Sequence, residues 1–406
     1  MKRLPLDGDR LRELAAEHGT PLYLLDLDVV RERLAMLEGF DVVRYAQKAN
    51  GNPSLLRLLA DSGAAVDAVS AGEIERALAT GFEPEAVQYT ADLFTPASLS
   101  LVGRYGLSVN VGSTDMLEQL AEALPGSEVT VRVNPGFGDG LHQGVSTGGE
   151  MSKHGIWHEE LPEAYRQAED LGLCVTGLHV HVGSGFDPAT TNKTIEALSR
   201  VLYAAPETVE TLSTGGGLPF PYRPGEQAFD VASFTASWLD ARQRWQTDLG
   251  RALRLEVEPG RHLVGEAGFI LTTVRTTKRT PDRQWALVDA GFHTLLRPAL
   301  YGAHHHISAI GRDGEEGVGV IVAGPLCEST DVLTVDDSGR PESRSLPEPR
   351  RGDLYCIHDA GAYGASMAST YNSQRLPAEV VIEAGLPRLS VRAQDRDELL
   401  DREVDS

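Results

Sequence analysis

The chain has 406 residues, which is too long for one ordinary domain and suits two, one of them a large barrel. Its 59 acidic and 37 basic residues give a formal net charge of −22, so we expect neither a nucleic acid nor an anionic membrane as a partner. No apolar run of about 18 residues and no secretory signal pattern is present. The three cysteines, Cys174, Cys327 and Cys356, are widely spaced, which favours free thiols. These features predict a soluble cytoplasmic protein.

Residues 31–265 alternate short apolar segments with longer amphipathic ones, and the segment 21–30 before them is either a strand of another domain or a link. The strand-like segments are 41–49, 64–70, 86–92, 107–113, 128–136, 173–185, 209–217 and 253–260. Helical patterns separate them, and some end with the glycine that a helix C-terminus prefers. Eight strands alternating with helices predict an α/β domain, a (β/α)8 TIM-type barrel.

The pattern changes after residue 265. Residues 266–406 contain apolar segments with strand composition and turn signals, with almost no helical periodicity. We expect a separate all-β, antiparallel C-terminal domain, to which residues 1–30 could add a strand. DVLTVDD, at 331–337, reads as one of its strands, whereas 336–352 reads as a surface loop because of its Gly, Pro and charge content.

Polar residues and glycines follow the predicted barrel strands at the ends where TIM-type barrels carry their active sites. They are Lys48 after the first strand; Asp67 and Ser70 after the second; His181, Gly183 and Ser184 after the sixth; Gly215, Gly216 and Gly217 after the seventh; and Glu258 and Arg261 after the eighth. Because these strand ends meet at one rim, the sequence predicts a single site there.

Each residue type at this rim suits one cofactor. Only five of the 37 basic residues are lysines, so Lys48 at the end of an apolar strand calls for a reason, and a desolvated amine suits a Schiff base. Consecutive glycines allow backbone N–H groups to approach a phosphate, with Ser184 and Arg261 as further donors. An aromatic ring could stack on His181, and Glu258 could keep a pyridinium nitrogen protonated. Together they predict pyridoxal 5'-phosphate.

Taken singly, these features are weak. A lysine at a strand end is more often a surface residue, and three glycines are usually a turn. The pair His179 and His181 could be a metal pair or a satisfied core pair, and His304–His306 favours a polar loop. No carboxylate or cysteine set with metal spacing accompanies the histidines, so no metal is expected.

The motifs YAQKAN, TGGEMSKHG, GLHVHVGSG, STGGGL, EPGR, AGPLCESTDVL and DAGAYGASMASTYNS resemble, in order, those of the diaminopimelate decarboxylase family. This family belongs to the alanine-racemase-like group of pyridoxal-phosphate enzymes. The resemblance runs from about residue 10 to 400. It implies that Lys48 forms the Schiff base, that Glu258 contacts the pyridine nitrogen, and that Cys327 donates a proton. It also implies cofactor contacts by Gly217, Arg261 and Tyr363. The residue types at the rim add Asp67, His181, Ser184, Gly215 and Gly216 to the expected cofactor contacts.

The resemblance also implies the substrate contacts, which are Arg261, Arg297, Tyr301, Glu328 and Tyr363. In relatives the Cys-Glu pair enters the site from the partner subunit, so a homodimer with shared active sites is implied. meso-Diaminopimelate carries a distal ammonium and a distal carboxylate, which an acid and an arginine would bind. Glu328 with Arg261 and Arg297 supplies that set, and the implied reaction yields L-lysine and CO2.

Three other functions remain open at this point. The first is a decarboxylase of ornithine, lysine or a related amino acid, and the segment SQRLPAEV at 373–380 departs from the family pattern near the pocket edge. The second is a racemase, against which the CES motif argues. The third is a non-catalytic pyridoxal-phosphate carrier, which would not need the large β domain.

Overall fold

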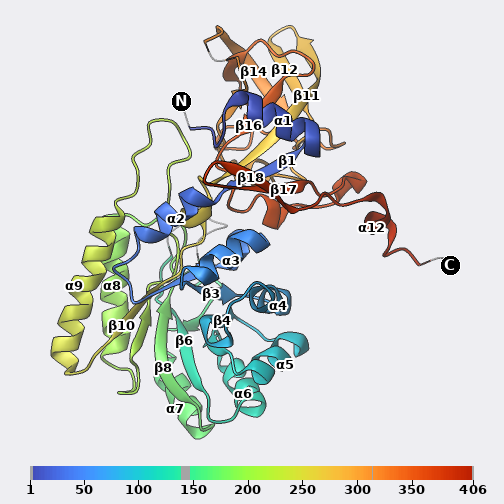
Figure 1. Ribbon diagram of the computed structural model, residues 1–406. Helices are drawn as coiled ribbons and strands as arrows, with labels where there is room; N and C mark the ends of the chain where they lie inside the picture. Colours follow the sequence, from blue (N-terminus) through green and yellow to red (C-terminus); the bar gives the residue numbers. More distant parts are fainter. Residues whose placement is uncertain (1–2, 139–146, 313, 405–406) are drawn as a thin grey trace. The chain divides into compact units, whose positions relative to one another are not determined.

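The computed structural model describes residues 3–138, 147–312 and 314–404, and the chain divides into two compact units (Figure 1). We call Glu32–Pro219 with Phe229–His262 the barrel unit, and Met1–Arg31 with Phe220–Ala228 and Leu263–Ser406 the β unit. The sequence-based division placed residues 220–228 inside the barrel domain, whereas the structure groups them with the β unit. Within the described ranges, no helix is long and apolar enough to cross a membrane.

The barrel unit contains a closed barrel in which, among the described residues, eight parallel strands follow the order β5-β4-β3-β2-β10-β9-β8-β6 and β6 pairs again with β5. The strands are β2 (Val42–Ala46), β3 (Ala65–Ala68), β4 (Val87–Ala91), β5 (Ser108–Val111), β6 (Glu128–Asn134), β8 (Cys174–Val180), β9 (Thr211–Ser213) and β10 (Arg254–Val257). Each one lies inside a predicted strand segment, which confirms the TIM-type barrel. A two-residue strand, β7 (Ile156–Trp157), pairs with β6 and was not predicted.

Helices surround the barrel strands, as Figure 1 shows for α3 to α9. They are α2 (Leu27–Ala35), which begins in the β unit, α3 (Pro53–Asp61), α4 (Ala71–Ala79), α5 (Pro96–Tyr105), α6 (Thr114–Ala123), α7 (Leu161–Asp170), α8 (Pro188–Leu202), α9 (Val231–Leu249) and the short α10 (Arg261–Val264), with 3-10 turns η1 (Gln47–Ala49) and η2 (Pro84–Ala86). Local chemistry sets their ends. The Asn52 side chain accepts hydrogen bonds from the first turn of α3, and Gly250 ends α9 in the left-handed conformation.

The barrel interior contains a buried ion pair one layer below the rim. Arg44 on β2 donates to both carboxylate oxygens of Glu256 on β10 at 3.1–3.2 Å, and each side chain is only 7% exposed. Successive strand residues point to opposite faces, so Glu258 lies on the same side as Glu256 but closer to the rim. Because the barrel is filled in layers, this pair forms the floor beneath the candidate site.

The β unit is built on one sheet in which, among the described residues, nine strands pair. They are β1 (Leu22–Asp26), β11 (Gly268–Thr280), β12 (Arg283–Val288), β13 (Ile307–Ala309), β14 (Gly317–Ala323), β15 (Arg344–Pro347), β16 (Leu354–Ile357), β17 (Ala378–Glu383) and β18 (Leu386–Val391). The expected antiparallel arrangement is mostly confirmed, but β1 pairs in parallel with β17 and β12 in parallel with β14. The N-terminal segment thus contributes β1 to this sheet.

Two local expectations in the β unit were wrong. Residues 344–347 inside the predicted loop form β15, because their backbone pairs with β14. Residues 331–337 form no strand; Val332 and Val335 make isolated bridges, while Thr334 Oγ1 accepts from the Val322 N–H.

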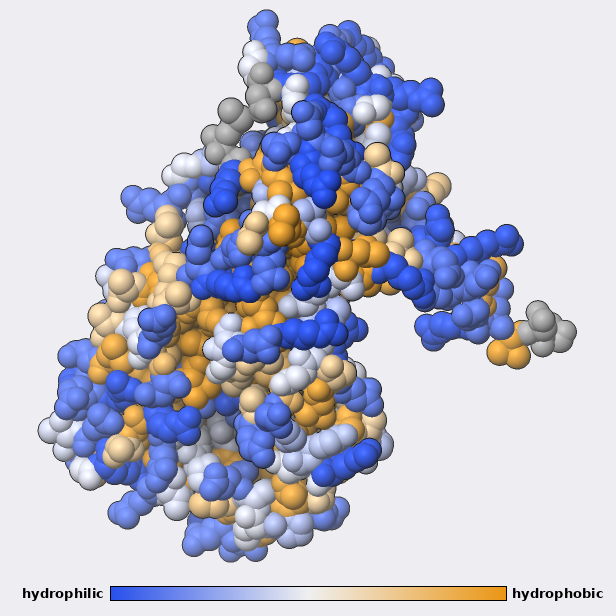
Figure 2. Space-filling view, viewed as in Figure 1, coloured by the Kyte–Doolittle hydropathy of each residue, from blue (hydrophilic) through white to orange (hydrophobic). Residues whose placement is uncertain are grey.

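The β unit also contains short helices. They are α1 (Gly8–His18), α11 (Arg297–Tyr301), α12 (Arg396–Leu400), η4 (Ala365–Met367) and η5 (Tyr371–Ser373). In α1, Leu11 and Leu14 are buried against the sheet, and its outer surface is mainly hydrophilic (Figure 2). This one-sided burial is what an amphipathic surface helix requires.

The buried pair predicts an asymmetric response to mutation. Replacing Glu256 with Leu leaves the Arg44 cation buried without its partner, so we expect the free energy of unfolding in urea to fall by about 3–5 kcal/mol. The double variant Arg44→Met/Glu256→Leu should recover most of this loss. Asp240→Ala, which breaks an exposed pair with Arg244 on α9, serves as the control and should change little. Equal effects for Glu256→Leu and Asp240→Ala would contradict the assigned role.

Candidate active site

Glu258 follows β10 at the rim of the barrel and is 6% exposed. His179 Nε2 lies 3.1 Å from its Oε2, and Ser213 Oγ donates to its Oε1 at 2.7 Å. Burial alone would raise the pKa of Glu258, but His179 and the Ser213 hydrogen bond lower it below its usual range. The carboxylate is therefore held ionised and in one orientation. The sequence motifs at the rim predicted Glu258 but did not single out Ser213. For His179 they left two interpretations open, a metal ligand and a core residue.

Asp67, at β3, is the second buried carboxylate of the site. Burial, followed by the nearby charge of Glu258, raises its pKa to about 7, while Lys48 acts in the opposite direction. Its Oδ1 has no hydrogen-bond partner among the described residues. The fold thus brings Asp67, Glu258 and Lys48 within electrostatic reach of one another.

Lys48 lies in the 3-10 turn η1, two residues after β2 ends, and its side chain is exposed. The expectation that an apolar strand buries this amine is therefore not met. Its neighbours Gln47 and Ala49 are buried, and Ala49 lies against the position where Gly260 would carry a side chain. The backbone of η1 is thus packed in place, while the Lys48 side chain stays accessible.

His181 is held as a neutral ring. Its Nδ1 accepts a hydrogen bond from the Gly216 N–H at 3.2 Å, which leaves the ring proton on Nε2. Burial, and then the charge of Lys48, lowers the pKa of His181 well below its usual value. The His179 ring lies parallel to it, with centroids 6.4 Å apart and an interplanar angle of 10°. An uncharged ring of fixed orientation is suited to stacking.

The three glycines after β9 are required by close backbone packing. A Cβ would lie 2.5 Å from the Val180 carbonyl oxygen at Gly215, 2.2 Å from that of Glu258 at Gly216, and 2.0 Å from that of Gly183 at Gly217. The N–H groups of Gly215 and Gly216 donate to Ser213 and His181. Two of the three donors expected for a phosphate are thus used internally. The Gly185 N–H donates to Gly217, which places Ser184 in the adjoining loop.

The TGGEMSKHG motif begins and ends at this rim. Thr147 Oγ1 donates to the His181 carbonyl at 2.9 Å, and Asn134 binds both the N–H and the carbonyl of Gly149. At the C-terminal end of the motif, the Gly155 N–H and His154 Nδ1 both donate to the Asp92 carboxylate. The motif thereby connects the ends of β4, β6 and β8.

The candidate residues in the β unit lie on three segments: the helix α11, the loop with Cys327 and Glu328, and the loop with Tyr363. Arg297 begins α11 and is buried, while Tyr301 ends that helix and is half-buried. Arg261, by contrast, belongs to the barrel unit, where it begins α10 and is half-buried.

Cys327 and Glu328 are both exposed, on a loop shaped by a residue that the sequence did not single out. Asp331 is 3% exposed and accepts from the backbone N–H groups of Phe292 and Leu326 at 2.7 and 2.8 Å. Asn372 Oδ1 accepts from the Cys327 N–H at 2.9 Å. Asp331 lies two residues after the tripeptide Cys-Glu-Ser, and nothing in the sequence pattern indicates that it is buried or that it binds backbone N–H groups.

Tyr363 has a left-handed backbone conformation, with φ of 59°. This region is strained for an aromatic residue, and such strain persists where the surroundings impose it. Its neighbours Gly361 and Gly364 are packed so closely that a Cβ would lie 1.8 Å from the Val264 carbonyl oxygen and 2.4 Å from that of Ala360. The loop thus holds Tyr363 in an unusual geometry typical of functional positions.

Comparison with known proteins agrees with this arrangement. Residues 27–265 match the family model described as "Pyridoxal-dependent decarboxylase, pyridoxal binding domain". Diaminopimelate decarboxylase of Escherichia coli K12 is 45% identical over 98% of this chain and 97% of its own length. A crystal structure of a diaminopimelate decarboxylase matches with a TM-score of 0.94 at 45% identity, covering 97% of this chain and 96% of that one. The Helicobacter pylori enzyme complexed with L-lysine matches at 29% identity with a TM-score of 0.86, covering 96% and 98%.

The barrel and its rim residues define a pyridoxal-dependent decarboxylase, a carboxy-lyase that uses pyridoxal 5'-phosphate. Within that class, the chain belongs to the diaminopimelate decarboxylase family. The resemblance inferred from the sequence motifs is thereby confirmed.

The residues of the barrel rim fit this cofactor. They supply an ionised buried carboxylate in Glu258, a neutral ring in His181, an accessible amine in Lys48, and a buried acid, Asp67, with an orphaned oxygen. These are the groups that a pyridine nitrogen, an aromatic face and an aldehyde require.

The raised pKa of Asp67 predicts a pH-dependent stability of the cofactor-free protein. Its folded-state pKa of about 7 exceeds the value of about 3.9 expected for the unfolded chain, so the folded state binds this proton more tightly. The contribution of Asp67 to the free energy of unfolding should therefore fall as pH rises from about 4 to 7, by on the order of 4 kcal/mol at most. Asp67→Asn should flatten this slope in urea titrations, whereas Asp61→Asn at the exposed end of α3 should not. An unchanged slope in Asp67→Asn would contradict the assignment.

Proposed function

We propose that this enzyme decarboxylates meso-2,6-diaminopimelate to L-lysine and CO2, the last step of lysine biosynthesis. The observation that carries the proposal is the Glu258 carboxylate, kept ionised by His179 and Ser213, with Glu258 and Lys48 both acting on the buried Asp67. The near-full-length similarity to enzymes named for this substrate supports the same assignment.

When bound, pyridoxal phosphate supplies an electron sink for the pair left when CO2 departs. Glu258 would hold a proton on the pyridine nitrogen, and His181 would cover one face of the ring. Lys48 would bind the aldehyde carbon through its amine. Ser184, Arg261 and Gly217 would bind the phosphate, while Gly215 and Gly216 would shape the turn beside it.

The β unit would recognise the substrate and return a proton. Glu328 suits the distal ammonium, while Arg297 with Arg261 suits the distal carboxylate, because arginine binds carboxylates in a bidentate manner. Tyr301 and Tyr363 would complete the pocket. Cys327 would deliver a proton from its thiol to the carbon that has lost CO2.

We further propose a homodimer in which Cys327 and Glu328 act in the partner's site. Both side chains are exposed, as a residue that serves another subunit must be in the isolated chain. A cytoplasmic location stays a prediction from composition. A decarboxylase of ornithine or lysine remains the alternative; it would require only the acid and would leave Arg297 without a substrate group to bind.

A substrate panel tests the reaction. With added pyridoxal phosphate, CO2 release should occur from meso-diaminopimelate and be at least about a hundredfold slower from ornithine and from D- or L-lysine, because these three amino acids keep a distal ammonium but lack the distal carboxylate. Turnover of ornithine or lysine with none of diaminopimelate would overturn the proposal.

Covalent labelling tests the role of Lys48. Borohydride treatment of the holoenzyme should attach a pyridoxyl group to the peptide that contains Lys48, as measured by mass spectrometry. Lys48→Ala should lose both this label and the yellow absorbance, while Lys193→Ala on α8 should retain them. A label on another lysine would exclude Lys48.

Mixed dimers test the shared site. Cys327→Ala should reduce turnover strongly while cofactor stays bound, and Cys174→Ala should be nearly unchanged. Random mixing of Lys48→Ala with Cys327→Ala chains should restore about a quarter of the activity, because half the dimers then hold one intact site. Absence of restoration after verified subunit exchange would rule out an active site built from two chains.

A further inference from the structure

Arg297 is a buried cation whose orientation is controlled by neighbouring side chains. It is 5% exposed at the start of α11. A guanidinium removed from water requires hydrogen-bond or ring partners that replace its hydration. Two such partners lie within the β unit, His305 and Tyr222.

The contacts of His305 determine which of its two ring nitrogens carries the proton. Arg297 Nη1 lies 2.8 Å from His305 Nε2, and His305 Nδ1 lies 3.0 Å from the His358 carbonyl oxygen. A guanidinium can only donate and a carbonyl can only accept. Nε2 must therefore be the bare nitrogen and Nδ1 must carry the proton. The two contacts together select one neutral tautomer of His305, which is 2% exposed.

Tyr222 fixes the plane of the same guanidinium. The Arg297 guanidinium carbon lies 4.5 Å from the centroid of the Tyr222 ring, a cation–π distance. The Tyr222 ring also meets that of His305 edge to face, with centroids 5.4 Å apart.

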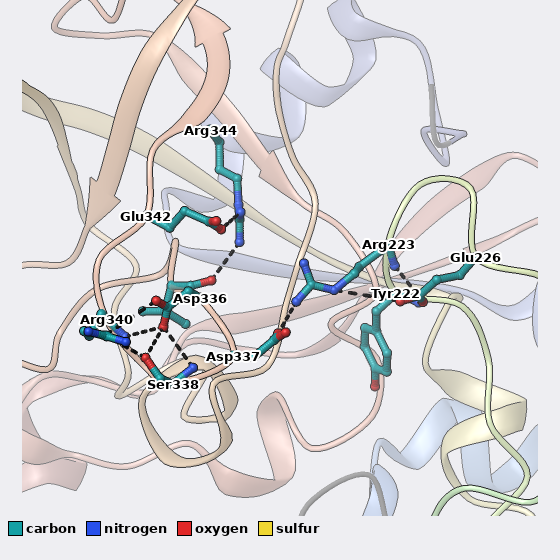
Figure 3. A network of polar contacts seen from close by, with 10 residues as sticks. Tyr222, Arg223, Glu226, Asp336, Asp337, Ser338, Arg340, Glu342 and Arg344 are labelled. Carbon is teal, nitrogen blue, oxygen red and sulfur yellow. Dashed lines mark hydrogen bonds and ion pairs between the residues drawn. The ribbon is translucent and has the colours of Figure 1, made fainter.

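The segment 220–228 that carries Tyr222 is anchored to the β unit by a polar network (Figure 3). Glu226 accepts from the N–H groups of Tyr222 and Arg223, at 2.8 and 3.0 Å, and Arg223 pairs with Asp337. The Glu226 contacts shape the segment itself, and the Arg223–Asp337 pair joins it to the rest of the β unit, with which the structure groups it.

We propose that His305, as the neutral Nδ1–H tautomer, is a positioning residue that orients Arg297 for the substrate carboxylate that decarboxylation leaves in place. The inference rests on the proposed function and assigns a role within the His304–His306 run. His305 acts through Arg297 and does not touch the substrate. L-lysine retains this carboxylate and cadaverine has none. The role of His305 therefore affects the binding affinity for L-lysine and not the affinity for cadaverine.

The experiment measures the binding of L-lysine and cadaverine to the holoenzyme by titration calorimetry. In His305→Leu, which removes the acceptor, affinity for L-lysine should fall about tenfold or more, since hydrogen bonds to charged groups carry that weight. Affinity for cadaverine should stay within about twofold, which also reports an intact fold. His305→Gln restores an acceptor oxygen and should recover most of the L-lysine affinity. His18→Leu, at the end of α1, is the control and should change neither ligand.

The KM for meso-diaminopimelate should rise in His305→Leu with a smaller change in kcat. Nitrogen NMR of histidine-labelled holoenzyme should show an unprotonated Nε2 and a protonated Nδ1 for one ring, whose signals disappear in His305→Gln. Equal loss of both ligands, unchanged L-lysine affinity, or a protonated Nε2 would overturn the proposal. If wild-type enzyme released no CO2 from diaminopimelate, the proposed function would fail instead, and the NMR result would still decide the tautomer.

Discussion

A carboxylate buried at the end of a barrel strand stays ionised only if the protein replaces the water it has lost. Glu258 receives that replacement from His179 and Ser213, and this interaction determines what the barrel rim can do. Burial and then the ionised Glu258 raise the pKa of Asp67, and Lys48 acts in the opposite direction. The opposite pKa directions of two buried acids, one lowered and one raised, give them different roles within one site.

The β unit solves a related problem for a cation. Arg297 is buried, and its guanidinium is contacted by an acceptor nitrogen of His305 and by the ring face of Tyr222. Both of these partners are uncharged, so neither one cancels the positive charge that Arg297 is proposed to offer to a carboxylate.

Much of the fold could be predicted because periodicity is a local property of sequence. All eight barrel strands coincide with predicted segments, and the rim residues follow from the rule that functional groups lie at strand C-terminal ends. Errors arose where pairing partners decide the conformation. Residues 344–347 form a strand because β14 offers a free edge, although their composition is that of a loop. The exposed side chain of Lys48 likewise depends on how η1 packs, which strand composition does not report.

The sequence by itself determined the barrel, the cofactor and the family, since glycine, lysine and carboxylate positions along the strands carry that information. Only the tertiary structure decided which side chains assist them. Ser213 and His179 meet Glu258 across three strands, Asp331 meets the N–H of Phe292, and Tyr222 meets Arg297 over 74 intervening positions of sequence. Hydrogen bonds and ring contacts depend on distances of a few ångströms, and a linear pattern contains no such distances.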